Sequence, residues 1–163
     1  MTDDGFHRLM SRLDYPMWIL TARAEDTGEP SGCLVGFATQ ASIDPGRFLI
    51  GVSRANHTFE VVNRAAHVGV HLPPAEDRRL ATLFGGETGD EVDKFAAVKW
   101  DDGPEDVPLL ADVADRFVGR VIERLDLGDH VGLLLEPVLV DVGPDRPFLT
   151  FTRVQPLDPG HDP

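Results

Sequence analysis

Apolar and small side chains alternate along residues 32–40, and neither face of this stretch is strongly polar. The pattern predicts a strand that is covered on both sides. Asp44-Pro45-Gly46 follows and predicts a tight turn, after which residues 47–53 alternate again. We therefore expect two strands that are joined by a turn, with the helix start at Asn56 beyond them.

The same reading assigns most of the remaining chain to strands with a few interposed helices. Further strands are predicted over 15–22, 67–72, 115–127, 131–142 and 148–151, and helices over 59–66, 76–84 and 89–96. Pro137 marks a bulge or an edge in its strand, and the acidic stretch 100–108 is expected to be a mobile loop. This order favours a small antiparallel barrel over an alternating α/β fold.

The N-terminal segment has a helical pattern of its own. Phe6, Leu9, Met10 and Leu13 recur at helical spacing after Thr2 and two aspartates. We expect a short amphipathic helix that packs on the barrel or on a partner subunit.

Composition narrows the class of protein. The chain of 163 residues suits one domain over 1–163, and its single cysteine excludes an internal disulfide and a multi-cysteine metal site. No signal-peptide pattern or membrane-spanning run is present, so the expected location is the cytoplasm. The net charge of −13 argues against nucleic acid as a partner.

The acidic charge is distributed unevenly. Residues 44–73 contain three arginines and two acids, whereas residues 74–115 contain twelve acids and four bases. An anionic ligand would prefer the first of these regions.

Two polar clusters follow the ends of the first strands and are expected to meet at one edge of the sheet. The first contains Thr39, Gln40 and Ser42, and the second contains Ser53, Arg54, Asn56 and Thr58. Hydroxyls, a guanidinium and free N–H groups at a helix start together favour a phosphate. Taken singly, each of these residues is explained as well by turn formation or helix capping.

Several other sites are excluded by spacing or by missing motifs. His67 and His71 lie on one predicted strand roughly 13 Å apart, which is too far for one metal ion to bridge. Cys33 lies within a strand and is expected to be buried rather than reactive. The chain contains neither G-x-G-x-x-G nor G-x-S-x-G, so any redox chemistry needs a bound organic cofactor.

An ordered set of short motifs resembles the flavin reductase family, whose fold is the FMN-binding split barrel. The motifs are T-x-x-S-x-D-P from Thr39, R-x-N-H-T from Arg54, Phe84-Gly-Gly, Asp93-Lys-Phe95 and Gly128-Asp-His130. The likeness covers roughly residues 14–151. Gly46 and Gly36-Phe37 depart from it, because many members have proline and Asn-Ser there.

This resemblance implies a Greek-key split barrel of about six antiparallel strands with peripheral helices, a homodimer, and FMN, or FAD, near the subunit interface. It implies that Thr39, Gln40 and Ser42 hold the ribityl chain and phosphate, that Ser53, Arg54, Asn56 and Thr58 complete the phosphate site, that Gly36, Phe37 and Ala38 face the isoalloxazine, and that Lys94 and Phe95 add contacts. The implied activity is NAD(P)H:flavin oxidoreductase, with the nicotinamide near His130 and reduced flavin passed to a monooxygenase.

Two alternatives remain open from the sequence. The same barrel could hold FMN as an electron-carrying module that never meets NAD(P)H, or it could bind haem or coenzyme F420. Within the predicted turn 127–130, Asp129 is placed to accept a hydrogen bond from the His130 ring and to fix its tautomer.

Overall fold

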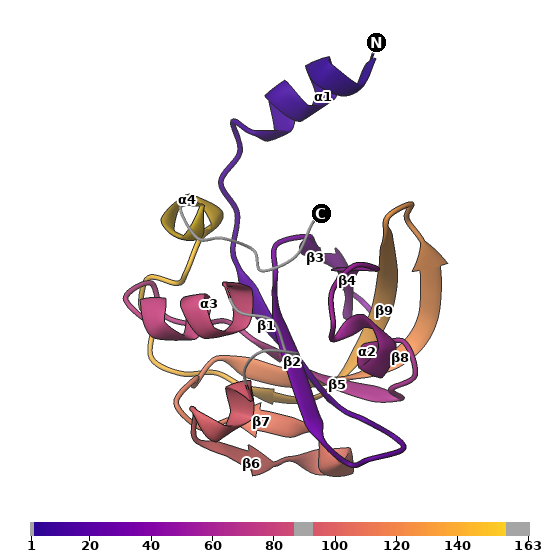
Figure 1. Cartoon of the computed structure of the whole chain (residues 1–163), viewed down its shortest axis with the longest axis vertical. Helices are drawn as coiled ribbons and strands as arrows, with labels where there is room; N and C mark the ends of the chain where they lie inside the picture. Colours follow the sequence, from indigo (N-terminus) through magenta and orange to yellow (C-terminus); the bar gives the residue numbers. More distant parts are fainter. Residues whose placement is uncertain (1, 87–92, 156–163) are drawn as a thin grey trace.

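Seven antiparallel strands form one sheet in the order β2-β1-β5-β8-β9-β4-β3 (Figure 1). The computed structural model describes residues 2–86 and 93–155. The sheet contains β1 (Trp18–Arg23), β2 (Pro30–Val35), β3 (Ala38–Ser42), β4 (Arg47–Ser53), β5 (His67–His71), β8 (Arg116–Asp126) and β9 (His130–Asp141). A separate hairpin pairs β6 (Trp100–Asp102) with β7 (Pro108–Leu110).

Short helices lie around this sheet. They are α1 (Thr2–Met10), α2 (Phe59–Val62), α3 (Arg78–Gly85), α4 (Phe151–Val154) and the 3-10 turns η1 (Lys94–Ala96) and η2 (Pro104–Asp106). Asp77 caps α3 by accepting a hydrogen bond from the backbone N–H of Leu80. No helix in the described ranges has the length and apolarity needed to cross a bilayer.

The sheet curls around the main hydrophobic core, as expected for a split barrel. Leu20, Val35, Ile50, Val68 and Leu133 come from five different strands, and each is at most 6% exposed. The two ends of the sheet order, β2 and β3, follow one another along the chain. The predicted β-rich class is therefore confirmed, and the opening of the barrel lies at the bend between β2 and β3.

The strand predicted over 32–40 is broken at Gly36 and Phe37. A Cβ atom on Gly36 would lie 2.7 Å from the Tyr15 ring, so the absence of a side chain makes room for the protein's own tyrosine. The next carbonyl, that of Phe37, accepts a hydrogen bond of 2.7 Å from Gly51 N–H. Packing at this bend overrides the apolar pattern, which continues through it.

Other boundaries also differ from the predictions. The stretch 100–108, predicted as a loop, begins with β6, and the neighbouring side chains Val107 and Leu109 are buried, which explains the order there. The predicted strand 148–151 is reduced to two isolated bridges before α4. Of the predicted helix 89–96, only η1 is seen, since residues 89–92 lie outside the described ranges. The bulge at Pro137 is confirmed by the shifted register between β8 and β9.

His71 is a buried structural residue of β5. Its Nδ1 donates to the carbonyl of Ile19 (3.1 Å), and its Nε2 accepts from Leu110 N–H (3.0 Å). Both ring nitrogens are therefore used by the backbone, and the neutral ring is the form that fits. Burial lowers the pKa of His71 to about 4, although the bond to Ile19 acts in the opposite direction.

This histidine makes stability dependent on pH. In the unfolded chain it titrates near pH 6.5, so unfolding takes up a proton as the pH falls from about 6.5 to about 4. The stabilisation is complete above pH 6.5 and is lost progressively below it. We expect the free energy of unfolding to fall by about 2 kcal/mol between pH 7 and pH 5 from this residue alone.

Denaturant titrations at both pH values measure this change. His67→Gln, on the same strand, should keep the pH dependence of the wild type. A His71 ring that titrates near pH 6.5 in the folded protein by NMR would contradict the prediction.

Candidate functional site

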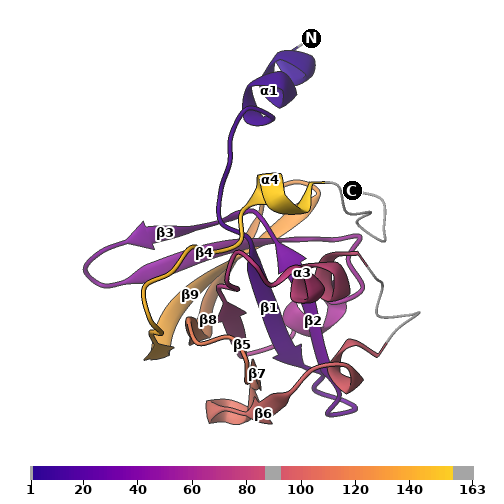
Figure 2. The same cartoon turned by 90° about the vertical axis from the view of Figure 1, so that its left-hand side faces the viewer.

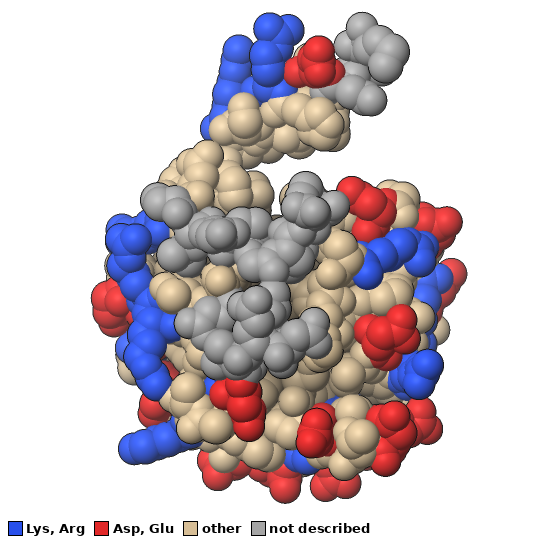
Figure 3. All heavy atoms as spheres, viewed as in Figure 1, with Lys and Arg blue, Asp and Glu red and all other residues tan. Residues whose placement is uncertain are grey.

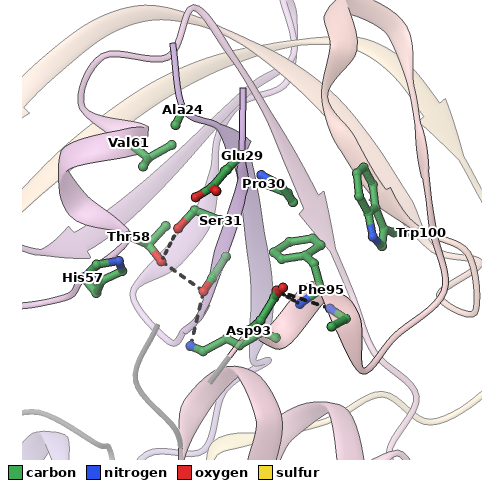
Figure 4. Close-up of a pocket in the computed structure, with 13 residues that line it drawn as sticks. Ala24, Glu29, Pro30, Ser31, His57, Thr58, Val61, Asp93, Phe95 and Trp100 are labelled. Carbon is green, nitrogen blue, oxygen red and sulfur yellow. Dashed lines mark hydrogen bonds between the residues drawn. The ribbon is translucent and has the colours of Figure 1, made fainter. Parts of the chain in front are cut away.

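A pocket of about 590 Å³ opens beside the start of β2, between the turn that precedes α2 and the 3-10 turn η1 (Figure 4). Its walls combine hydroxyls, charged groups and aromatic rings. The lining residues are Ala24, Glu29, Pro30, Ser31, Gly32, His57, Thr58, Val61, Asp93, Lys94, Phe95, Ala96 and Trp100. Three of these residues, Thr58, Lys94 and Phe95, are among those predicted from the sequence.

Thr58 joins the start of α2 to β2. Its Oγ1 donates to the carbonyl of Gly32 (3.0 Å) and lies 3.1 Å from the donating Oγ of Ser31. Asn56 Oδ1 accepts from the Thr58 N–H (2.9 Å), so the predicted capping side chain acts on the residue that occupies the N-cap position. These bonds hold two hydroxyls together at the wall of the pocket.

Lys94 brings a buried positive charge to the same pocket. Its Nζ lies 3.4 Å from the carbonyl oxygen of Gly32 and 3.3 Å from that of Phe84, and 5.8 Å from the Phe84 ring. The side chain carboxylate of Asp93 accepts from the N–H groups of Phe95 and Ala96 and so fixes the turn that carries the lysine. An ammonium in a low-dielectric wall attracts anions more strongly than one in water.

Cys33 is fully buried and is not a nucleophile. Burial raises the pKa of its thiol to about 11, despite the opposing effect of Lys94. The thiol is therefore protonated at neutral pH, as expected from its position in a strand.

A second cluster forms where β4 ends beside the turn 127–129. Arg54 Nε donates to the carbonyl of Gly128 (3.0 Å), and its Nη2 donates to Asp126 Oδ1 (3.2 Å). Gly128 has a φ of +112°, and its N–H also bonds to Asp126, which lowers the pKa of that carboxyl. Arg54, predicted as a phosphate ligand, here ties this turn to β4.

His130 stands at the start of β9, directly opposite Ser53 of β4. Its Nδ1 donates to Asp129 Oδ1 at 2.7 Å, which confirms the predicted pair and lowers the pKa of Asp129. The ring centroid lies 4.9 Å from that of Phe37, whose side chain is 60% exposed. This bond leaves Nε2 of a neutral ring as an acceptor beside an exposed aromatic ring.

The predicted residues are thus divided among three places. The pocket is lined by Thr58, Lys94 and Phe95, and Asn56 is bonded to Thr58. The His130 end of β4 holds a second group, which consists of Gly36, Phe37, Ala38, Ser53 and Arg54. The third group lies along β3, away from both, and consists of Thr39, Gln40 and Ser42.

The two polar clusters do not meet as one cradle within this chain. Ser42 lies opposite Arg47, whereas Ser53 ends the same strand β4 six residues further on. At about 3.3 Å per residue the separation is roughly 20 Å, so one phosphate cannot contact both Ser42 and Arg54 of one chain. The bend at Gly36 and Phe37 does lie beside the end of β4, because the Phe37 carbonyl accepts a hydrogen bond from Gly51 N–H.

Several lining residues were not found from the sequence. Ser31 and Glu29 precede the motifs that resemble the family, and Trp100 begins the acidic stretch 100–108, for which a loop is predicted. Only the pairing of β2 with β1 and the packing of η1 beside β2 bring them together, so no local pattern indicates them.

Comparisons with known proteins identify relatives of moderate similarity. A ferric-chelate reductase (NAD(P)H) of Archaeoglobus fulgidus is 24% identical over 154 residues, and the match covers 93% of this chain and 90% of that protein. An FMN reductase (NADH), RutF, of Variovorax paradoxus is 27% identical, with 85% and 75% covered. Two relatives from Rhizobium meliloti are longer, and this chain spans 50% of one and 35% of the other.

A solved structure of similar fold is the flavin reductase domain protein from Arthrobacter sp. FB24. It has a TM-score of 0.81 and 26% sequence identity, and the superposition covers 91% of this chain and 90% of that one. The family model described as the flavin reductase like domain matches residues 10–156. Because this match spans nearly the whole chain, the protein belongs to the flavin reductase like domain family.

Proposed function

We propose that this protein is an NAD(P)H-dependent flavin reductase that binds FMN in the pocket beside β2. The observation that carries the proposal is the buried Lys94 ammonium next to the Ser31 and Thr58 hydroxyls, in a chain of this family. The names of two relatives, an FMN reductase (NADH) and a ferric-chelate reductase (NAD(P)H), support it.

The residues of the pocket fit a flavin mononucleotide. A volume of about 590 Å³ lies within the range usual for cofactor sites. Lys94 and the paired hydroxyls supply the charge and hydrogen bonds that a phosphate needs. The chain carries net −13, so a local cation is needed to hold an anionic ligand.

The ring end of the flavin would lie toward the bend at Gly36–Ala38. The edge strand β2 connects this bend with the pocket, since Ser31 stands at one end of the strand and Val35 at the other. The Tyr15 ring occupies the space beside Gly36. The exposed surface at the bend is therefore that of the Phe37 side chain. Thr39, Gln40 and Ser42 would contribute only at the far side of this hairpin.

The nicotinamide would bind against Phe37 and His130. When bound, the flavin supplies the redox chemistry by accepting a hydride from the nicotinamide. The Asp129 carboxylate holds the His130 ring in one tautomer, and Arg54 holds the turn that carries both residues. Orientation of the two rings then provides most of the rate enhancement, and no strong acid or base is required.

We further propose a homodimer, and a monooxygenase as consumer of the reduced flavin. The homodimer and the monooxygenase partner are proposed together with the reductase activity. FAD is an alternative flavin, because the pocket is open to solvent and leaves room for a longer ligand.

The proposal is tested by the visible spectrum of the purified protein, with and without added FMN, followed by anaerobic NADH or NADPH. We expect a flavin spectrum that bleaches on addition of the nicotinamide. A bound flavin that neither nucleotide reduces would indicate an electron-carrying module, and a haem or F420 spectrum would exclude the proposed cofactor.

Lys94→Gln should weaken FMN binding about 10- to 100-fold, the loss of one charge-assisted interaction of roughly 1.5–3 kcal/mol. Lys99→Gln, at an exposed lysine, removes the same charge and should leave the affinity unchanged. Titration of the protein with FMN by fluorescence quenching measures both. Equal affinities of the two variants for FMN would show that the phosphate does not bind beside Lys94.

His130→Ala should lower kcat/KM for NADH by tenfold or more and leave the affinity for FMN unchanged. The reason is that His130 faces Phe37 and not the pocket. Asp129→Asn should give a smaller loss, since it disturbs only the tautomer. His67→Ala serves as the control, and a His130→Ala enzyme with unaltered kinetics for NADH would refute the role.

A further inference from the structure

Two glycines face each other in the strands that lead to His130. Gly51 of β4 lies directly opposite Gly132 of β9, one pair along from Ser53 and His130. Residues that are opposite each other, or two apart on a strand, point to the same side of a sheet, so these four residues share one face. In Figure 2 the strands β3, β4, β9 and β8 follow one another across one side of the molecule. The glycine pair leaves part of this face without side chains of its own.

The side chain of Leu127 lies over the glycine pair. A Cβ atom on Gly132 would lie 3.0 Å from Leu127 Cδ1, and one on Gly51 would lie 3.6 Å from the same atom. The Leu127 N–H donates to the His130 carbonyl (3.0 Å), so these two residues stand opposite each other on either side of the turn. The leucine therefore lies against the sheet beside His130, yet it remains 51% exposed.

Phe37 lies on the other side of the same glycine pair. Its carbonyl accepts from Gly51 N–H (2.7 Å), and its Cβ lies 3.5 Å from the position that a Cβ on Gly51 would take. Its ring centroid is 4.9 Å from that of His130. We call the side chains of Phe37, Leu127 and His130 the ring platform. Contacts through the glycines and between the two rings join all three.

The chemistry of the ring platform suits a small flat ring that carries a hydrogen-bond donor. Phe37 and Leu127 are 60% and 51% exposed and offer apolar surface. His130 Nδ1 donates to Asp129, so Nε2 of the neutral ring is an acceptor. A nicotinamide ring is flat, and the NH₂ of its carboxamide can donate to such an acceptor.

The charges around the ring platform favour the same ligand. The side chains of Asp126 and Asp129 are 78% and 77% exposed, and only Asp126 is paired with Arg54. Figure 3 shows red acidic side chains at the upper right, where the tip of the β8–β9 hairpin lies in Figure 1. Carboxylates repel a phosphate, whereas the reduced nicotinamide ring is uncharged and its oxidised form is a cation. The platform therefore fits the ring end of a dinucleotide rather than an anionic group.

We propose that Leu127 is a binding residue for the nicotinamide ring, which lies between Phe37 and Leu127 with its carboxamide toward His130 Nε2. Gly132 is a positioning residue, because a Cβ atom there would displace the end of the Leu127 side chain. This inference rests on the proposed reductase function and adds two residues to its nicotinamide site. Neither residue belongs to the pocket beside β2.

Steady-state kinetics of Leu127→Ala at saturating FMN test the binding role. We expect KM to rise about fivefold for NADH and NADPH alike, with kcat and the affinity for FMN unchanged, because part of one leucine no longer covers the ring. Leu127→Met keeps the apolar contact and should restore KM. Val140→Ala, at an exposed apolar residue near the other end of β9, is the matched control and should behave as the wild type.

A double-mutant cycle tests whether Gly132 acts through Leu127. Gly132→Ala should raise KM for NADH by a smaller factor in the wild type and add little in the Leu127→Ala background, because the side chain that it displaces is then absent. An equal rise in both backgrounds would overturn the positioning role of Gly132.

Failure of this inference can be told apart from failure of the proposed function. A wild type that oxidises NADH, with a Leu127→Ala variant of unaltered KM, would overturn the role of Leu127 alone. Weaker FMN binding by Leu127→Ala would show that the platform covers the flavin or supports its site, and would also overturn that role. A wild type that holds FMN and oxidises neither NADH nor NADPH would overturn the reductase activity and this inference together.

Discussion

The pairing of β4 with β9 is the interaction on which the site depends. Its register places Ser53 opposite His130 and Gly51 opposite Gly132. A Cβ atom at Gly132 would lie 3.0 Å from Leu127 and 3.1 Å from Leu49, so the close approach of side chains here needs glycine. A slip of one residue would turn every side chain of β4 to the other face. The turn at 127–129, Phe37 and His130 would then separate.

A second constraint is electrostatic. The chain has a strongly acidic balance, yet the wall of the pocket contains a buried ammonium fixed by the carbonyls of Gly32 and Phe84. Because burial weakens screening by water, this one lysine can oppose the repulsion that the overall charge exerts on an anionic ligand. By contrast, the Arg54 guanidinium donates its hydrogen bonds to Gly128 and Asp126 and so stabilises the turn that leads to His130.

The N-terminal and C-terminal segments of the described chain bind each other. Thr152 donates two hydrogen bonds to Asp14, and Phe151 stacks on Tyr15, so α4 holds the segment that leads into β1. Short segments outside the main sheet therefore help to position the start of β1. Their contacts combine hydrogen bonds with apolar burial, since Met17, Leu149 and Val154 belong to one buried cluster.

The sequence by itself determined most of the strands of the main sheet, the turn at 127–129, the pairing of Asp129 with His130 and membership of a flavin reductase type of barrel. These features depend on local alternation and on short motifs, which can be recognised in the sequence without information about distant contacts. It also indicated Thr58, Lys94 and Phe95, but not that they share a pocket with Ser31 and Trp100. Tertiary structure alone decided that, together with the break at Gly36, the separation of Ser42 from Arg54 and the internal use of Arg54. Each of these depends on strand register and on side chains far apart in the chain, and no local pattern encodes such contacts.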